Sequence, residues 1–578
     1  MSFLDPRRLA ARAREALGVA RGLASARPIA NLRPAGLADL AVRVARRDVD
    51  PAYLFRAHAL NIGARTAVIA SDKTLTYAEL DRSMNRIAHV LRAQGIGPND
   101  HVAVMLPNSA AWIECLGGVS RLRAKIVAVG YRLSPREIAH MLTDAECKLF
   151  LFGAQFAERV AEAAREAAFP FDRLLAIADG QGARVPAGIA ALDERCAAAP
   201  AEAPPRDRRR GRAGVIIYTS GTTGKPKGAV RGMGGGIVDF LLSIYRALPV
   251  RAGDVHLTAS PLYHSLAWAF VTVGFSLGDT QVLLEHWDPE EALRAMARHG
   301  VNTTAMVPTM LKDLADLPPA VRARHDVSAL RGIFASGARL GADLRAEVMA
   351  AFGPKLYDLY GATEYGFVIY AGPEQMKKNI GALGVAFPGC EIRLLGDDGR
   401  EVGEGEVGEV FVRNTMIFEG YYKRPDATAA GARGGFYSVG DMARRDADGY
   451  FTLADRKTDM IVSGGANVYS AEVEAALHEH PGIDEAAVIG VPDERLQEAV
   501  KAYVVLEPGA VLTGEEVQAF CATRIASFKK PRHVEFVRYL PKNPTGKILK
   551  RDLREWHKGA RPADADPAWT PAVATAPA

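Results

Sequence analysis

Short apolar runs alternate with amphipathic stretches over roughly the first two thirds of the chain. The runs at 100–109 (DHVAVMLPNS), 148–153 (KLFLFG), 173–179 (RLLAIAD) and 214–220 (GVIIYTS) are typical of strands buried inside a sheet. Between such runs apolar residues recur at positions i, i+3 and i+4, which indicates helices that bury one face. Alternating strands and helices predict an α/β fold with a mainly parallel sheet and helices on both of its faces.

The pattern changes at two places. Residues 265–278 (SLAWAFVTVGFSLG) are apolar on every side but too few to span a membrane, which predicts a helix buried in the core. Residues 381–439 contain short strand-like runs with turn signals between them, which predict a small β-rich piece. A compact α+β domain is expected after Asp455.

We expect four parts in the chain. They are an Arg-rich N-terminal segment (1–48), a large N-terminal domain (49–454), a smaller C-terminal domain (455–558) and a tail (559–578). The tail is rich in Ala and Pro, and we expect it to be disordered.

Composition narrows the class of protein. With 578 residues, 48% hydrophobic and 24% charged, the chain is typical of a soluble globular enzyme. A net charge of +5 is small for this length and argues against nucleic acid as a partner. The five cysteines are scattered and form no CxxC pair, which argues against a disulfide framework and a zinc site and indicates a reducing compartment. We therefore expect a cytoplasmic protein.

The first 50 residues carry ten arginines, no lysine and five acidic residues, so their net charge equals that of the whole chain. Arginines interrupt every apolar stretch, and no signal-peptide core is found. The segment is compatible with a solvated helix, with an arm packed on the body, or with peripheral contact at the inner face of a membrane.

The stretch IYTSGTTGKPKGA (217–229) is rich in hydroxyls, glycines and lysines and follows an apolar strand. Such a loop between a strand and a helix presents backbone N–H groups to phosphate, so we expect a strand–loop–helix phosphate cradle. It is not a Walker A loop, because Pro226 follows Lys225. The pattern GEGEVG (403–408) is acidic and precedes a strand, so we interpret it as a hairpin turn and not as a dinucleotide site.

The stretch YTSGTTGKPKG resembles the phosphate-loop signature of the adenylate-forming superfamily, which includes acyl-CoA synthetases, luciferases and the adenylation domains of peptide synthetases. The resemblance covers about residues 54–556 and is strongest to fatty-acid–CoA ligases. It implies a large N-terminal domain of α/β sheet subdomains and a mobile α+β C-terminal domain. Four further motifs follow in the family's order: YGATE (360–364), YSVGD (437–441), DRKTDMIVSGGANVYSAEVE (455–474) and PKNPTGKILKRDL (541–553).

The resemblance also implies roles for single residues. Lys547 would bridge the substrate carboxylate and the α-phosphate, and Thr363 would hold the α-phosphate. Glu364 offers a hard oxygen ligand for Mg²⁺. Asp441 would bind the ribose hydroxyls with Arg456 as its partner. The remaining residues expected at the ATP and CoA sites are Thr219, Ser220, Gly221, Thr222, Thr223, Gly224, Lys225, Lys227, Gly337, Ala338, Asp358, Tyr360, Gly361, Gly464 and Gly465.

Two features depart from the family pattern. The hinge about which the C-terminal domain turns is normally Asp or Lys, but Thr458 stands at this position and Asp459 follows it. The usual Glu of the pantetheine-tunnel loop is Ala466. Whether Asp459 takes over the hinge role is left open by the sequence.

The resemblance predicts an enzyme that activates a carboxylic acid with ATP and Mg²⁺ and transfers the acyl group to CoA. His264 and Trp268 fall in the acyl-pocket segment, and no Asp or Lys there would hold an α-amino group. We expect a medium- or long-chain fatty acid. The alternatives are a CoA ligase for an aryl or other hydrophobic acid, an acyl-AMP ligase that loads a carrier protein, and an inactive lipid-binding protein.

Overall fold

The computed structural model describes residues 51–178, 185–205, 207, 211–219, 226–232, 236–463, 466–543 and 546–560. The Arg-rich segment and nearly all of the expected tail therefore lie outside the described residues. The chain divides into two compact units, one containing residues up to 391 together with 413–437, the other residues 392–412 and those from 438 onward. The boundary at residue 454 and the other expected limits stay predictions.

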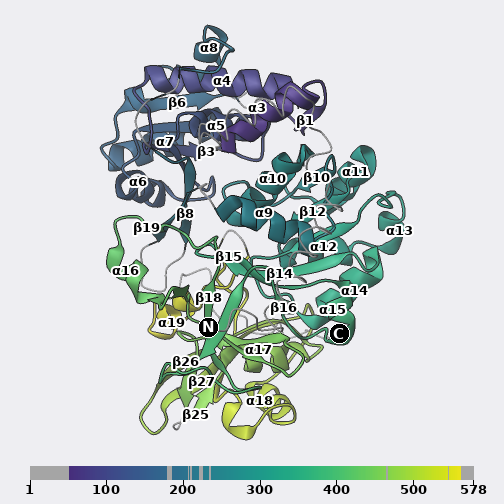
Figure 1. The fold of residues 1–578 in the computed structure, drawn as a ribbon. Coiled ribbons are helices and arrows are strands. Elements are labelled where there is room, and N and C mark those ends of the chain that lie inside the picture. Colours follow the sequence, from purple (N-terminus) through teal and green to yellow (C-terminus); the bar gives the residue numbers. More distant parts are fainter. Residues whose placement is uncertain are drawn as a thin grey trace, which may run out of the picture. The chain divides into compact units, whose positions relative to one another are not determined.

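The first unit contains a sheet with the strand order β19-β9-β8-β4-β3-β5-β6-β7. Figure 1 labels β3, β6, β8 and β19 of this sheet. Neighbours from β8 to β7 run parallel, whereas β9 and β19 are antiparallel additions at one edge. The strands are β3 (His101–Met105), β4 (Lys125–Ala128), β5 (Leu149–Gly153), β6 (Leu174–Ile177), β7 (Ala190–Ala191), β8 (Gly214–Thr219), β9 (Lys227–Gly232) and β19 (Gly420–Tyr421).

Both faces of this sheet are covered, as the continuous apolar runs predicted. In β3, Val102 and Val104 enter a core shared with α4 and α5, whereas Ala103 and Met105 enter a core shared with α6 and α7. Successive side chains of a strand point to opposite faces, so a strand buried on both sides must be apolar throughout. The helices that flank this sheet or pack on those helices are α3 (Pro51–Ile62), α4 (Tyr77–Ala93), α5 (Ala110–Arg121), α6 (Pro135–Asp144), α7 (Ala157–Glu166) and α8 (Leu192–Ala197).

A second sheet of the first unit has the order β16-β15-β14-β13-β12-β10-β11-β1-β2 and is parallel from β14 to β1. Its strands are β1 (Thr66–Ile69), β2 (Thr74–Thr76), β10 (Val255–Thr258), β11 (Thr280–Leu283), β12 (Thr303–Met306), β13 (Gly332–Ala335), β14 (Leu356–Ala362), β15 (Gly366–Ala371) and β16 (Val385–Ala386). The other helices of this unit are α9 (Gly236–Ala247), α10 (Ser265–Leu277), α11 (Pro289–His299), α12 (Pro308–Asp316), α13 (Pro319–Arg322), α14 (Ala342–Phe352), α15 (Pro373–Lys378) and α16 (Pro425–Ala430).

Helix α10 confirms the prediction of a buried core helix. Leu266 and Phe270 pack in the core of the second sheet, while Trp268 and Val271 pack in a core of the first sheet. A helix that lies between two cores has no solvent-facing side, so apolar residues surround it completely.

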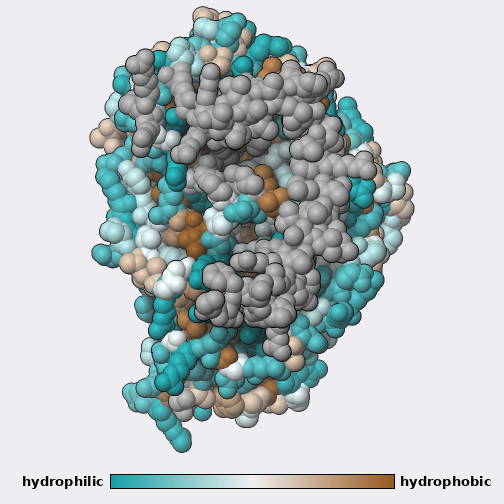
Figure 2. Space-filling model, viewed as in Figure 1, coloured by the Kyte–Doolittle hydropathy of each residue, from teal (hydrophilic) through white to brown (hydrophobic). Residues whose placement is uncertain are grey.

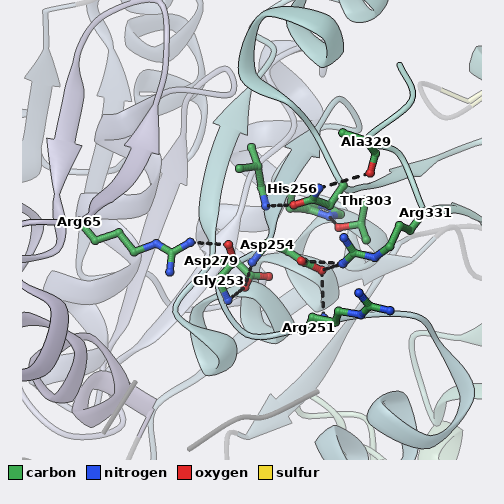
Figure 3. A network of polar contacts seen from close by, with 11 residues as sticks. Arg65, Arg251, Gly253, Asp254, His256, Asp279, Thr303, Ala329 and Arg331 are labelled. Carbon is green, nitrogen blue, oxygen red and sulfur yellow. Dashed lines mark hydrogen bonds and ion pairs between the residues drawn. The ribbon is translucent and has the colours of Figure 1, made fainter. Parts of the chain in front are cut away.

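A polar network joins the loops that precede β10 and β11 in the second sheet (Figure 3). The Oδ1 atom of Asp279 accepts the backbone N–H groups of Gly253 and Asp254, each at 3.0 Å. Arg331 donates to both carboxylate oxygens of Asp254 at 2.6 and 2.5 Å, and Arg65 donates to the carbonyl of Gly253. Burial and the neighbouring Asp254 raise the pKa of Asp279 well above its usual range.

The second unit contains β17 (Glu391–Leu395), β18 (Gly408–Arg413), β22 (Asp441–Arg445) and β23 (Phe451–Arg456), followed by a further sheet and three helices. In that sheet β26 pairs with β27, and alternate residues of β26 enter two cores, one beneath α17 and α18 and one beneath α19. The elements are β24 (Ile461–Ser463), β25 (Ala466–Val468), α17 (Ser470–His478), β26 (Ile483–Asp493), β27 (Gln497–Leu506), α18 (Gly514–Ala522), β28 (His533–Phe536) and α19 (Lys550–His557).

The visible described surface is mostly hydrophilic, and the apolar residues on the face shown in Figure 2 form only small patches. Few large apolar side chains of the described part are exposed; they are Leu60, Phe171, Val511, Phe528 and Tyr539. Among the described residues, no helix combines the length and the hydrophobicity that a membrane span needs.

Candidate active site

The strands on either side of the phosphate loop are well defined. Thr219 ends β8 and Lys227 begins β9. The other loop residues expected to bind phosphate (Ser220, Gly221, Thr222, Thr223, Gly224 and Lys225) lie outside the described residues.

The expected strand–loop–helix order is wrong, because the loop leads into a strand. Residues 227–232 form β9, which pairs antiparallel with β8. Thr219 lies opposite Lys227, and Gly214 lies opposite Gly232. Helix α9 begins only at Gly236. The polar stretch therefore connects the two strands of a hairpin. The backbone N–H groups expected to bind phosphate do not belong to the N-terminus of a helix.

Thr363 and Glu364 lie in the turn between β14 and β15. Glu364 is 6% exposed, and its Oε1 accepts a hydrogen bond from the Tyr421 hydroxyl at 2.6 Å. Its carbonyl accepts the backbone N–H of Phe418 at 2.7 Å. The turn is therefore held from a segment more than fifty residues further along the chain.

Arg231 is a buried cation beside this turn that the sequence analysis did not identify. It donates to the carbonyl of Thr363 and to that of Met416, the latter at 3.1 Å. Burial lowers the pKa of Arg231 to about 10, and the charge of Glu364 opposes this decrease. The available signal was an arginine inside the otherwise apolar or small run GAVRG, where a charged side chain needs partners.

The sequence analysis also missed Tyr421, which contacts both Glu364 and Lys227. Its ring lies beneath Lys227, with Nζ 5.5 Å from the ring centroid, and β19 pairs with β9 so that Tyr421 is opposite Ala229. Sequence reasoning had no local pattern to select this tyrosine, since its partner Glu364 is distant in the chain.

The residues expected around adenine are brought together by neighbouring parallel strands. Gly337 and Ala338 follow β13, and Asp358, Tyr360 and Gly361 lie on β14. Gly337 has a φ of +94°, a backbone conformation that favours glycine. The strand and loop expected around residues 335–340 are present, and β14 lies next to them in the sheet; the adenine-binding role of these residues stays a prediction.

Asp358 has a partner that the sequence did not reveal. The Nη2 atom of Arg345, on α14, donates to Asp358 Oδ2, and the two side chains are 2% and 6% exposed. Arg345 Nη1 also donates to the carbonyls of Ile380 and Ala382, both at 2.6 Å. Burial raises the pKa of Asp358, and the charge of Arg345 opposes the shift. An ion pair therefore engages this carboxylate in the structure.

His264 and Trp268 lie one turn apart at the start of α10. Among the described residues, no hydrogen-bond partner is found for His264 Nε2, Trp268 Nε1 or the hydroxyl of the neighbouring Tyr263. Burial, with a smaller effect of Arg132, lowers the pKa of His264 to about 4, so the ring is neutral at neutral pH. Buried donors without partners are costly, which makes this a place where a ligand atom can be held.

In the second unit, Asp441 and Arg456 stand opposite each other on β22 and β23. Arg456 Nε donates to Asp441 Oδ1 at 3.1 Å, and Asp441 is only 6% exposed. The structure thus brings together the pair expected to bind ribose.

Lys547 lies in a turn closed by a bridge between Lys542 and Ile548. Asn543 secures this turn: its Oδ1 accepts the Lys547 N–H, and its N–H donates to the Lys547 carbonyl, each at 2.9 Å. Gly546 has a φ of +80°, which permits the tight turn. The hydrogen bonds with Asn543 therefore hold the backbone of Lys547 in place.

The segment around the expected hinge contacts the helix that follows Lys547. Arg554 on α19 donates to the carbonyl of Thr458 at 3.1 Å and to Asp459 Oδ1 at 2.8 Å. Gly464 and Gly465 of the expected pantetheine loop lie outside the described residues, and Ala466 begins β25.

The donor set suits Mg²⁺ bound together with a polyphosphate. Within the described part of the chain, no group of three or more His, Cys, Asp or Glu side chains could hold a metal ion. Mg²⁺ usually takes one or two carboxylates and completes its shell with phosphate oxygens and water. Tyr421 engages Oε1 of Glu364, so Oε2 is the carboxylate oxygen available for such a ligand.

The chain matches the family model of AMP-binding enzymes over residues 55–422 and that of the AMP-binding enzyme C-terminal domain over residues 472–547. It therefore belongs to the AMP-binding enzymes and is an adenylate-forming acid–CoA ligase that uses ATP and CoA, as the motifs predicted.

Individual relatives agree with this assignment. The chain is 38% identical to a feruloyl-CoA synthase of Amycolatopsis, over 85% of this chain and 95% of the relative. It is 33% identical to a long-chain-fatty-acid–CoA ligase of Mycobacterium tuberculosis, over the same shares of both chains. The fold resembles ATP-bound MatB from Rhodopseudomonas palustris, with a TM-score of 0.78 and 28% identity over 88% of this chain and 99% of that structure.

Proposed function

We propose that the protein converts a medium- or long-chain fatty acid into its CoA thioester in two steps. First, a carboxylate oxygen of the acid attacks the α-phosphorus of ATP, and pyrophosphate leaves as the acyl-AMP forms. Then the CoA sulfur attacks the acyl carbon, AMP leaves, and the thiol proton is released. The observation that best supports this is the turn carrying Thr363 and the buried Glu364, held by Tyr421 and Arg231 beside the strands of the phosphate loop.

Each residue has a task that its surroundings allow. Bound Mg²⁺ would neutralise charge on the polyphosphate. Glu364 Oε2 and the Thr363 hydroxyl would hold this end of the nucleotide, and Lys547 would bring the carboxylate to the α-phosphate. Two anions must approach each other in this step, so a positioned cation between them lowers the barrier by electrostatic stabilisation.

The apolar character of α10 agrees with a fatty acid, although its packing between two cores requires apolar residues in any case. Beyond its first turn this helix presents only apolar or small side chains and two hydroxyl residues, Thr272 and Ser276, whose hydroxyls donate to the carbonyls of Trp268 and Val273 within the helix. The likeness to the mycobacterial long-chain-fatty-acid–CoA ligase points the same way.

One observation favours an oxygen-bearing aryl acid as a second candidate. The hydroxyl of Tyr263 and the indole N–H of Trp268 are buried and have no partner among the described residues. An acid with a phenol or methoxy oxygen could accept these donors, whereas an alkyl chain could not. The likeness to the feruloyl-CoA synthase agrees with this candidate.

Pyrophosphate release with ATP and Mg²⁺ tests both candidates. The panel runs from acetate to eicosanoate and includes benzoic, cinnamic and ferulic acids, each with and without CoA. A fatty-acid ligase should prefer the longer alkanoates and reach steady turnover only with CoA. Preference for ferulate would establish the second candidate, and the Tyr263→Phe variant should then raise the KM for ferulate at least tenfold but not that for cinnamate.

Two other outcomes would reject the proposed CoA transfer. A single burst of pyrophosphate that CoA does not change would indicate an acyl-AMP ligase that loads a carrier protein. No release and no ATP binding would indicate an inactive lipid-binding protein.

A further inference from the structure

Glu364 has a single hydrogen-bond donor to its carboxylate in the described structure, the hydroxyl of Tyr421 at 2.6 Å from Oε1. At 6% exposure, water does little to solvate this carboxylate. A short hydrogen bond between a hydroxyl and a buried carboxylate is one of the stronger neutral-to-charged contacts in proteins. It restricts the carboxylate's rotation and leaves Oε2 for another ligand.

The backbone that carries Tyr421 is fixed on both sides. Its N–H donates to Thr428 Oγ1 at 2.9 Å, and the N–H of Tyr422 donates to the carbonyl of Gly228 at 2.8 Å, in β9. Gly420 has a φ of +130°, and a Cβ there would lie 3.1 Å from the Thr428 side chain. The tyrosine therefore projects from an edge strand that is tied to the strand following the phosphate loop.

The ring of Tyr421 makes contacts that its hydroxyl does not. Lys227 Nζ lies 5.5 Å from the ring centroid, and Phe418 packs edge-on at 5.0 Å. A cation over the ring face is attracted by the ring's quadrupole. One side chain thus contacts the lysine at the end of the phosphate loop and the carboxylate on the β14–β15 turn.

We propose that Tyr421 is a positioning residue that orients the Glu364 carboxylate for Mg²⁺. Its ring also holds the Lys227 side chain in place relative to that carboxylate. The inference rests on the proposed function, because the metal accompanies ATP there. Removing the hydroxyl allows the carboxylate to rotate and leaves the ring contact with Lys227 in place. The loss should therefore appear in metal binding more than in the affinity for the acid.

The Tyr421→Phe variant tests this, with Tyr422→Phe as a matched control. The Tyr422 hydroxyl donates to Glu146 Oε2 at 2.8 Å, an exposed pair that does not involve Glu364. Two quantities are measured: the Mg²⁺ concentration for half-maximal pyrophosphate release, and the binding of Mn²⁺ with ATP, without any acid, by electron paramagnetic resonance. Tyr421→Phe should weaken both about 10- to 100-fold, the range for one hydrogen bond to a buried charge, and Tyr422→Phe should change neither by more than twofold.

A double variant separates orientation from general damage. In a Glu364→Gln background, Tyr421→Phe should change Mn²⁺·ATP binding by less than twofold, since the charge it orients is gone. Wild-type-like binding by Tyr421→Phe, or equal losses in both tyrosine variants, would overturn the inference alone. Absence of Mn²⁺·ATP binding by the unaltered protein would overturn it together with the proposed function.

Discussion

Arg345→Met should destabilise the first unit strongly, because Asp358 would be left as a buried carboxylate without its counter-ion. The two side chains are 2% and 6% exposed, and Arg345 also donates to the carbonyls of Ile380 and Ala382. Removing one partner of a buried, hydrogen-bonded ion pair typically costs about 3–5 kcal/mol. For a unit of roughly 400 residues, an unfolding entropy of about 2 cal/mol/K per residue converts this into a fall in Tm of about 4–6 °C.

The assay is thermal unfolding followed by near-ultraviolet circular dichroism, and the transition of the first unit is compared between variants. Arg294→Met provides the control, since Arg294 pairs with Glu291 at the surface, where the side chains are 57% and 45% exposed. An exposed pair of this kind contributes about 0–1 kcal/mol. The double variant Arg345→Met with Asp358→Asn should recover at least half of the loss, because no charge then remains buried.

The effect of pH gives an independent check. Burial already raises the pKa of Asp358, and Arg345 opposes that shift; without the arginine the pKa rises further. When the folded-state pKa lies above the unfolded one, the folded protein takes up the proton first as the pH falls. The deficit of Arg345→Met should therefore be largest near pH 8 and shrink toward pH 5. A deficit no larger than that of Arg294→Met, or one that does not change with pH, would refute the reasoning.

Three further predictions concern other parts of the molecule. Asn543→Ala should slow acyl-AMP formation about tenfold, because the turn presenting Lys547 loses one side-chain contact. Lys547→Ala should slow it at least about 100-fold. Equal rates of pyrophosphate release in the wild type and Asn543→Ala would contradict the role given to Asn543. Burial lowers the pKa of His256 to about 3, so the folded state excludes a proton that the unfolded chain binds, and stability should decrease as pH falls from about 6.5. His256→Gln should lessen that decrease in Tm between pH 7 and pH 4, and an unchanged slope would argue against it. Arg554→Gln removes the contact between α19 and Asp459. It should slow thioester formation from supplied acyl-AMP about tenfold, while the rate of adenylation changes less than threefold. Equal effects on both steps would exclude a hinge role for Asp459.

Local sequence patterns predicted the strands and helices that are buried on every side. The apolar runs at β3, β5 and β8 and the all-apolar helix α10 were recognised because burial on every side leaves a continuous signature. After the phosphate loop, the helix expected beyond the glycines is present as α9, but strand β9 ahead of them was missed, because its short apolar run suits a helix start as well as a strand. Pairing with β8 and β19 decided the matter, and β19 lies nearly 190 residues further along the chain.

The sequence by itself determined the family and the order of the motifs, and it predicted the residue types expected at the ATP site, since each motif is a short run whose chemistry can be recognised without its neighbours. Only the tertiary structure showed that Arg231 supports Thr363, that Arg345 neutralises Asp358 and that Tyr421 holds Glu364. The physical reason is that a buried charge or hydroxyl needs a partner within about 3 Å, and that partner is set by which strands pair and not by proximity along the chain.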